Sequence, residues 1–278
     1  MTGPIDAHVH LWNRTTDPQP WIDPVTMAAI DRDFSAADLA GMLDSTGAGT
    51  AVVVQAGNSL GETRRLLDDP SPRVAGVVGW IDLTGDVGGQ LRTLGPGAGS
   101  GPGRRLVGIR HLVHVDPDPD WLGRPDVGSS LDRLGAHDLC FDLVLRPWQT
   151  AAAADVAAAR PGTRFVVDHL GGVAESTDDR SWESGLRALA ARPNVYAKIS
   201  GLAALVADPA RLRRVVEVAL DAFGARRLMY GSDWPMACLT AGPAGWRTAV
   251  DELIAGLGAD ERRAVLGTTA AVCYRLGA

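Results

Sequence analysis

Short apolar runs recur along the chain at spacings typical of a repeated strand–helix unit. They predict strands at Ile5–Leu11, Ala51–Gln55, Val74–Ile81, Leu106–His111, Cys140–Leu145, Phe165–His169, Val195–Ile199 and Leu228–Gly231. Helical patterns lie between them at Thr150–Arg160, Trp182–Ala191, Pro209–Phe223, Pro243–Gly256 and Asp260–Leu276, and Ser35 is the expected N-cap of another helix. Eight strands alternating with helices predict an α/β fold, a (β/α)8 TIM-like barrel in which residues 1–278 form a single domain.

The main alternative is a doubly wound open sheet, which would place a glycine-rich phosphate turn after the first strand. The chain has His-Leu-Trp-Asn at that position, which disfavours the open sheet. A glycine-rich stretch does occur at Gly95–Gly103, but it lacks the Gly-Lys-Ser/Thr ending of a P-loop. We expect it to be a mobile loop at the N-terminal face of the barrel, far from the chemistry.

Composition narrows the classes of function. The chain of 278 residues has 46% hydrophobic and 22% charged residues, an ordinary globular balance. A net charge of −6 argues against nucleic-acid binding, and no apolar run approaches the roughly 18 residues of a membrane span. Neither a secretory signal nor a disulfide framework is recognisable, since Cys140, Cys238 and Cys273 are scattered. We therefore expect a cytoplasmic protein with a small-molecule substrate and no nucleic-acid or membrane partner, either a monomer or a homo-oligomer.

Two histidines one residue apart, His8 and His10, are the first candidates for chemistry. Side chains alternate along a strand, so both project from the same face and can share one metal ion, water or substrate atom. The last predicted strand runs into Gly-Ser-Asp-Trp-Pro, which places Asp233 directly after it. In a closed barrel the first and last strands are neighbours, so we expect Asp233 to lie beside the two histidines.

Polar or aromatic residues also end the other predicted strands, where the active sites of such barrels are built. They are Gln55, Trp80, Asp82, Arg110, His111, Arg146, Asp168, His169 and Lys198. Any one of them alone could be an ordinary loop residue or a paired core residue, but their recurrence indicates a site. Alternation places Arg110 and His111 on opposite faces, so at most one is expected to face the pocket.

Lys198 is the sole lysine among 27 basic residues, and it lies in an otherwise apolar strand. A buried lysine is rare unless it is paired, and a compact ammonium could bind a carbonyl oxygen, a carboxylate or Asp233. The alternative is a surface lysine without a role. Five tryptophans that follow predicted strands could line a pocket that stacks a ring-shaped substrate, or could simply pack under loops: Trp12, Trp80, Trp121, Trp148 and Trp234. His114 and His137 are expected at the surface.

Five segments together resemble the amidohydrolase-related (amidohydrolase 2) family of the amidohydrolase superfamily. They are the IDAHVHLW start, VGIRHL, DHLGG, VYAKISGL and RLMYGSDWP, and the resemblance spans nearly the whole chain. The chain is most similar to the branch of sugar-lactone hydrolases acting on fuconolactone and rhamnonolactone. The resemblance implies a distorted (β/α)8 barrel with His8, His10, His169 and Asp233 at the reaction centre.

The chain departs from the metal-dependent members of that family, which add a histidine after the fifth strand or a lysine or glutamate after the fourth. Here the fifth strand has no histidine and the fourth offers Arg110 and His111. The resemblance therefore implies at most one divalent metal (Zn, Mn or Mg), held by His8, His10 and Asp233, with or without His169. We expect that metal to be weakly bound or not required, with Lys198 and Arg110 as the cations that replace it.

The resulting hypothesis is a hydrolase that opens a small lactone, in which Asp233 is the general base for water. His8, His10 and Lys198 stabilise the oxyanion, and His169 orients the water or protonates the leaving group. The expected substrate-binding residues are Arg110, Gln55, Trp80, Arg146, Trp12 and Trp234. The alternatives are a metal-dependent decarboxylase of the same superfamily and a catalytically inactive barrel that binds a sugar acid. The lactone, its ring size and the pathway stay open.

Overall fold

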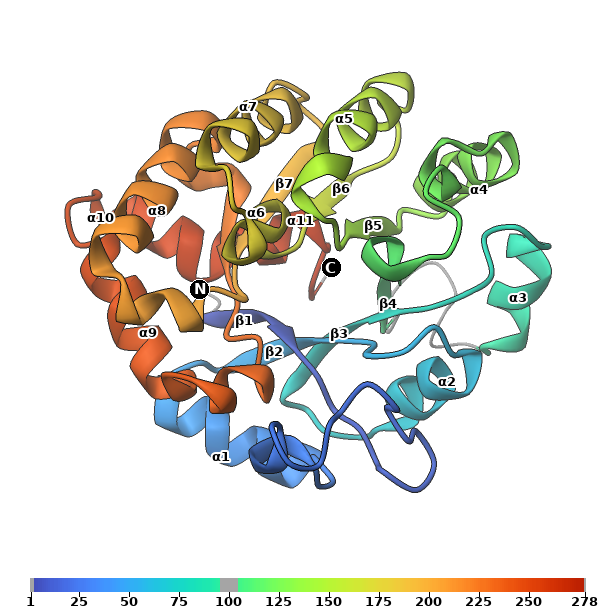
Figure 1. Cartoon of the computed structure of the whole chain (residues 1–278). Coiled ribbons are helices and arrows are strands. Elements are labelled where there is room, and N and C mark those ends of the chain that lie inside the picture. The colour runs from blue at the N-terminus through green and yellow to red at the C-terminus, as the bar shows by residue number, and fades with distance from the viewer. Residues whose placement is uncertain (1–2, 96–104, 278) are drawn as a thin grey trace.

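The computed structural model describes residues 3–95 and 105–277 and is built around a barrel of parallel strands (Figure 1). The strands follow one another around the sheet in chain order, as β1 (Ile5–Val9), β2 (Thr50–Val54), β3 (Val74–Gly79), β4 (Leu106–His111), β5 (Cys140–Leu143), β6 (Phe165–Val167), β7 (Val195–Ile199) and β8 (Leu228–Tyr230). Each pairs in parallel with the next. The predicted (β/α)8 barrel is confirmed.

An outer ring of helices covers the barrel, as Figure 1 shows. It comprises α1 (Ala36–Thr46), α2 (Leu60–Asp68), α3 (Val87–Thr93), α4 (Pro125–Ala136), α5 (Thr150–Ala159), α7 (Asp179–Ala190), α8 (Pro209–Phe223) and α9 (Gly242–Leu253). The predicted cap of α1 is confirmed, because Ser35 accepts a hydrogen bond from the Asp38 amide. Helices α2, α3 and α4 were missed from the pattern of the sequence, although Ser59, Asp86 and Pro125 mark their first turns in the usual way.

The predicted C-terminal helix Asp260–Leu276 is present as a continuous helical run, made of α10 (Ala259–Arg263), a π-helical turn (Ala264–Thr268) and α11 (Thr269–Cys273). The predicted end of the sixth strand at His169 was wrong. Strand β6 ends at Val167, so Asp168 and His169 lie beyond it, and His169 begins the short helix α6 (His169–Gly172). The glycine-rich loop expected at Gly95–Gly103 lies outside the described residues apart from its first residue. No helix in the described ranges is long and apolar enough to cross a bilayer.

The barrel closes where the ends of β1 and β8 meet. The Asp233 amide donates to the His8 carbonyl at 2.9 Å, and the His10 amide donates to the Trp234 carbonyl at 2.7 Å. A Cβ atom on Gly231 would lie 2.7 Å from the Cβ of His8, so only glycine allows this approach. The sequence expectation that Asp233 lies beside the two histidines is therefore realised by direct backbone pairing.

Candidate active site

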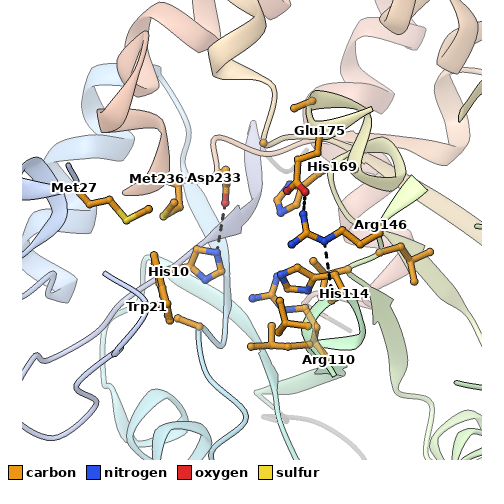
Figure 2. Close-up of a pocket in the computed structure, with 18 residues that line it drawn as sticks. His10, Trp21, Met27, Arg110, His114, Arg146, His169, Glu175, Asp233 and Met236 are labelled. Atoms are coloured by element: carbon orange, nitrogen blue, oxygen red, sulfur yellow. Dashed lines mark hydrogen bonds and ion pairs between the residues drawn. The ribbon is translucent and has the colours of Figure 1, made fainter. Parts of the chain in front are cut away.

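A cavity of about 520 Å³ opens at the C-terminal ends of the strands, within the size range of small-molecule sites. Five of the residues expected to carry chemistry line it (Figure 2): His10, Arg110, Arg146, His169 and Asp233. The other residues expected to carry chemistry lie beneath the cavity or away from it, as described below.

Three potential metal-binding atoms converge at the base of the cavity. The Nε2 atoms of His8 and His10 lie 3.2 Å apart. Asp233 Oδ1 lies 3.6 Å from the His8 Nε2 and 3.4 Å from the His10 Nε2. The Nδ1 of His10 lies 2.7 Å from the Val54 carbonyl, which can only accept, so this nitrogen carries the proton and Nε2 presents its lone pair to the other two atoms.

This donor set fits a divalent cation. Ligands of a tetrahedral zinc at about 2.0–2.1 Å lie about 3.3–3.4 Å from one another, close to the separations found between His8, His10 and Asp233. Two imidazoles and a carboxylate are also the ligand types that catalytic zinc sites use. A second group, His8, Asp168 and His169, also brings its ligand atoms within 4.8 Å of one another. The chain can therefore hold one metal at the positions expected from the sequence.

Four fully buried polar residues form a network beneath the cavity. We call these residues, His8, Asp142, Asp168 and Lys198, the polar floor. The Lys198 Nζ is 2.6 Å from Asp142 Oδ2 and 2.9 Å from Asp168 Oδ1. It also lies 3.1 Å from the His8 Nδ1, and the Tyr274 hydroxyl donates to Asp142 at 2.7 Å. Burial lowers the pKa of Lys198, but the two carboxylates outweigh it and raise the pKa above its usual value.

The sequence left open a carbonyl oxygen, a carboxylate or Asp233 as the partner of Lys198, and the structure shows two carboxylates, Asp142 and Asp168. The ammonium does not reach the cavity, because the side chain is completely buried in the polar floor. The ammonium instead lies 3.1 Å from the Nδ1 of His8, and the Nε2 of the same ring lies 3.6 Å from Asp233 Oδ1. Asp168 was named from the sequence only as a residue that follows a strand, and Asp142 was not singled out; the signal available was a carboxylate within or directly after an apolar strand.

Asp233 and His169 occupy strained backbone positions, with φ of 58° and 55°. Non-glycine residues adopt such angles mainly where the surrounding structure enforces them, often at functional sites. The His169 Nδ1 lies 2.9 Å from the Ser200 hydroxyl, and a Cβ on Gly201 would collide with the imidazole at 2.4 Å. Burial opposes ionisation of Asp233, but His169, His10 and His8 outweigh burial and lower the pKa of this carboxyl below its usual range.

Arg110 reaches from the end of β4 into the cavity and also contacts the polar floor. Its NH1 donates to Asp168 Oδ2 at 3.0 Å and lies 3.5 Å from the His8 Nε2. Its NH2 donates to the Gln55 carbonyl. Gln55 is fully buried and returns a hydrogen bond to the Arg110 carbonyl at 3.0 Å, so it positions Arg110 and does not itself line the cavity.

None of the five tryptophans proposed to line a pocket does so. Trp12 and Trp234 pack edge-on against Phe34 in the core, Trp80 donates to the His111 ring at 3.1 Å, and Trp121 stacks on that same ring. Trp148 is 76% exposed on the surface. The aromatic residue that does line the cavity is Trp21, from the segment between β1 and α1, which carries no regular pattern. Strand-end position was therefore a poor guide to the aromatic residues.

The outer part of the cavity has an apolar side and a charged side, and we call Trp21, Met27, Met236, Arg146 and Glu175 the cavity wall. Arg146 forms an ion pair with Glu175, and the two point toward each other in Figure 2. His114, expected at the surface, also lines the cavity. Burial, together with the nearby Arg110 and Arg146, lowers the pKa of His114 to about 4, so it is neutral at pH 7.

Comparison with known proteins places this site in a family. The amidohydrolase family model matches residues 5–276. An L-fucono-1,5-lactonase from Burkholderia ambifaria is 36% identical over 231 residues, which is 81% of this chain and 77% of that protein. An L-fucono-1,5-lactonase from Burkholderia multivorans is 31% identical, with 98% and 96% of the two chains covered.

Solved structures agree with this assignment. A crystal structure of an amidohydrolase from Burkholderia multivorans with bound HEPES superposes with a TM-score of 0.90 at 31% identity, covering 98% of this chain and 99% of that one. A structure of an amidohydrolase from the same organism with bound zinc gives a TM-score of 0.89. The resemblance inferred from the motifs is confirmed: the chain belongs to the amidohydrolase family.

Proposed function

We propose that this enzyme hydrolyses a small lactone, most simply a sugar aldonolactone, by attack of water on the lactone carbonyl. The observation that carries the proposal is the convergence of His8, His10 and Asp233 at the base of a cavity sized for a monosaccharide derivative. Similarity to two L-fucono-1,5-lactonases, one of them over nearly the full length, supports the choice of a cyclic ester as substrate.

Asp233 is the proposed general base. Its lowered pKa keeps the carboxylate ionised at neutral pH, so it can accept the proton of the attacking water. As the water oxygen bonds to the carbonyl carbon, the bond from that carbon to the ring oxygen breaks. His169, which lines the same cavity, delivers a proton to the departing ring oxygen. The product is an open-chain hydroxy acid that releases its own proton at neutral pH.

The negative charge that develops on the carbonyl oxygen needs a cation at the base of the cavity. Arg110 is the side chain best placed for this, because it lines the cavity and its NH1 lies 3.5 Å from the His8 Nε2. Lys198 is too deeply buried to contact the substrate, so we assign it the task of holding His8 through the polar floor. Gln55 acts on the reaction by orienting Arg110.

A single divalent metal, held by His8, His10 and Asp233, would add a positive charge that polarises the lactone carbonyl. Zinc is the candidate suggested by the zinc-bound relative. The Arg110 guanidinium lies so near the His8 Nε2 that it repels a second cation, so we propose weak binding. Elemental analysis of the purified protein should give well under one metal per chain, and tight stoichiometric zinc together with complete inactivation by chelators would contradict this.

A panel of aldonolactones tests the reaction class. The purified enzyme should open at least one five- or six-membered sugar lactone and release one proton per turnover, followed with a pH indicator. Release of carbon dioxide from an aromatic or unsaturated carboxylic acid, with no turnover of any lactone, would refute the proposal.

A further inference from the structure

The arginine and carboxylate charges on the cavity lining are equal in number. Among the described residues that line the cavity, Arg110 and Arg146 are the cations of lysine or arginine type, and Asp233 and Glu175 are the carboxylates. His114 adds no charge at pH 7 because its pKa is lowered. Each arginine also has a carboxylate partner of its own, Asp168 for Arg110 and Glu175 for Arg146. Among the described lining residues, the cavity therefore offers an anionic substrate no arginine that lacks a carboxylate partner.

The pair formed by Arg146 and Glu175 differs from the pair in the polar floor because the solvent reaches it. The side chain of Arg146 is 30% exposed and that of Glu175 is 55% exposed. Arg146 follows β5 and is steadied by its amide, which donates to Gln149 Oε1 at 2.8 Å. Glu175 ends the 3-10 turn Val173–Glu175 that follows β6. Loops after two neighbouring strands thus bring the pair together at the cavity wall.

We propose that Glu175 determines specificity, by neutralising Arg146 so that the cavity accepts uncharged hydroxylated lactones and rejects lactones that carry a carboxylate. The inference rests on the proposed lactonase function and adds the charge class of its substrate. An arginine without a partner is a strong two-point binder of carboxylates. With Glu175 in place, an anionic substrate must compete with this carboxylate and is also repelled by it.

The pair of Arg146 and Glu175 can still form hydrogen bonds with a neutral substrate. A guanidinium has five N–H donors, and an ion pair with one carboxylate uses only some of them. The remaining donors of Arg146 and the accepting oxygens of Glu175 can bind hydroxyl groups of a sugar ring. Removal of the negative charge at position 175 should therefore weaken the binding of neutral substrates slightly and strengthen the binding of anionic substrates.

The test compares two lactones with related hydroxyl patterns. The neutral probe is L-fuconolactone, the substrate class named for two relatives, and the anionic probe is galactarolactone, which carries a carboxylate in place of the terminal methyl group. The ratio of kcat/KM for the neutral probe to that for the anionic probe is measured for the wild-type protein and for Glu175→Gln. We expect the ratio to fall roughly two- to fivefold in Glu175→Gln, a size appropriate to a partly exposed ion pair.

Three further measurements make the result specific. Glu175→Asp keeps the charge and should restore most of the wild-type ratio. Glu217→Gln removes the same charge from the exposed face of α8, outside the cavity lining, and should leave the ratio unchanged. Added salt should reduce the discrimination of the wild-type protein, because exposed charges are screened.

The outcomes separate this inference from the proposed function. A wild-type enzyme that opens the neutral lactone, together with a Glu175→Gln ratio equal to that of the wild type, would overturn the role of Glu175 and leave the lactonase intact. A wild-type enzyme that prefers the anionic probe would likewise overturn the role of Glu175 and leave the lactonase function intact. Failure of the wild type to open either lactone, or any other in the panel, would reject both.

Discussion

The polar floor and the cavity wall both hold ion pairs, but they place them in opposite surroundings. Lys198, Asp142 and Asp168 are completely excluded from solvent, whereas Arg146 and Glu175 are partly in contact with it. A buried charge is tolerated only while all its partners are present, since water cannot replace them. A partly exposed pair can lose a member and be solvated instead. The polar floor should therefore control the stability and geometry of the site, and the cavity wall should control which substrate binds.

Asp233 lies between the two regions, and its replacement should have the largest effect on the reaction. Asp233→Asn keeps the size of the side chain but removes the proposed base, so turnover should fall at least about a hundredfold, within the range for positioned proton transfer. Binding of the open sugar acid, measured by calorimetry, should weaken far less.

Asp251→Asn makes the same chemical change at the surface of α9 and serves as the control. Near-normal turnover of Asp233→Asn would mean that Asp233 only terminates the last strand, and His169 would become the candidate base.

Lys198→Met tests the polar floor directly. It leaves Asp142 and Asp168 buried without their shared ammonium, and breaking a buried pair in this way costs about 3–5 kcal/mol in the free energy of unfolding. Urea denaturation followed by circular dichroism would measure the loss. Arg214→Met, which breaks an ion pair with Glu183 on the surface of α8, should cost about 1 kcal/mol or less.

A Lys198→Met protein with unchanged stability but with turnover lowered about a hundredfold would restore Lys198 as an oxyanion donor, contrary to its placement.

Tyr274→Phe is a gentler test of the same region. It removes one hydrogen bond to Asp142 while Lys198 stays in place, so the free energy of unfolding should fall by roughly 1–3 kcal/mol. Turnover should change little, since the hydroxyl is remote from the cavity. Tyr196→Phe, on the partly exposed side of β7, is the matched control. An equal effect of the two substitutions would show that the hydrogen bond to Asp142 contributes nothing.

Trp21→Ala tests the cavity wall and should have the smallest effect on the fold. Trp21 is 39% exposed and lines the cavity, so its loss should raise KM several-fold through lost contact with the substrate. The free energy of unfolding should change by about 1 kcal/mol or less. Trp148→Ala, at an exposed position outside the lining, should leave KM unchanged. If only Trp148→Ala changed KM, the substrate would contact a tryptophan that follows a strand, as the sequence suggested, and Trp21 would have no role in binding.

The proximity of the candidate site residues His8, His10 and Asp233 could be predicted from local sequence, because strand geometry determines it. Alternation along β1 places His8 and His10 on one face. Barrel closure brings Asp233 beside them, and this placement does not depend on the conformation of the loops. The same reasoning singled out Arg110 and His169, which line the cavity. These features depend on the two-residue alternation of side chains along a strand and on the order of the strands. The pattern of apolar residues in the sequence indicates both.

The depth of each side chain and the composition of the cavity wall were decided only by the tertiary structure. Alternation indicates that Lys198 faces the barrel interior, but not that Asp142, Asp168 and Tyr274 gather around it from β5, from the end of β6 and from the C-terminus. Trp21, Met27 and Glu175 come from segments without periodicity, whose course depends on packing against distant elements. Local pattern determines which face a residue takes, whereas contacts between residues far apart in the chain determine what it meets there.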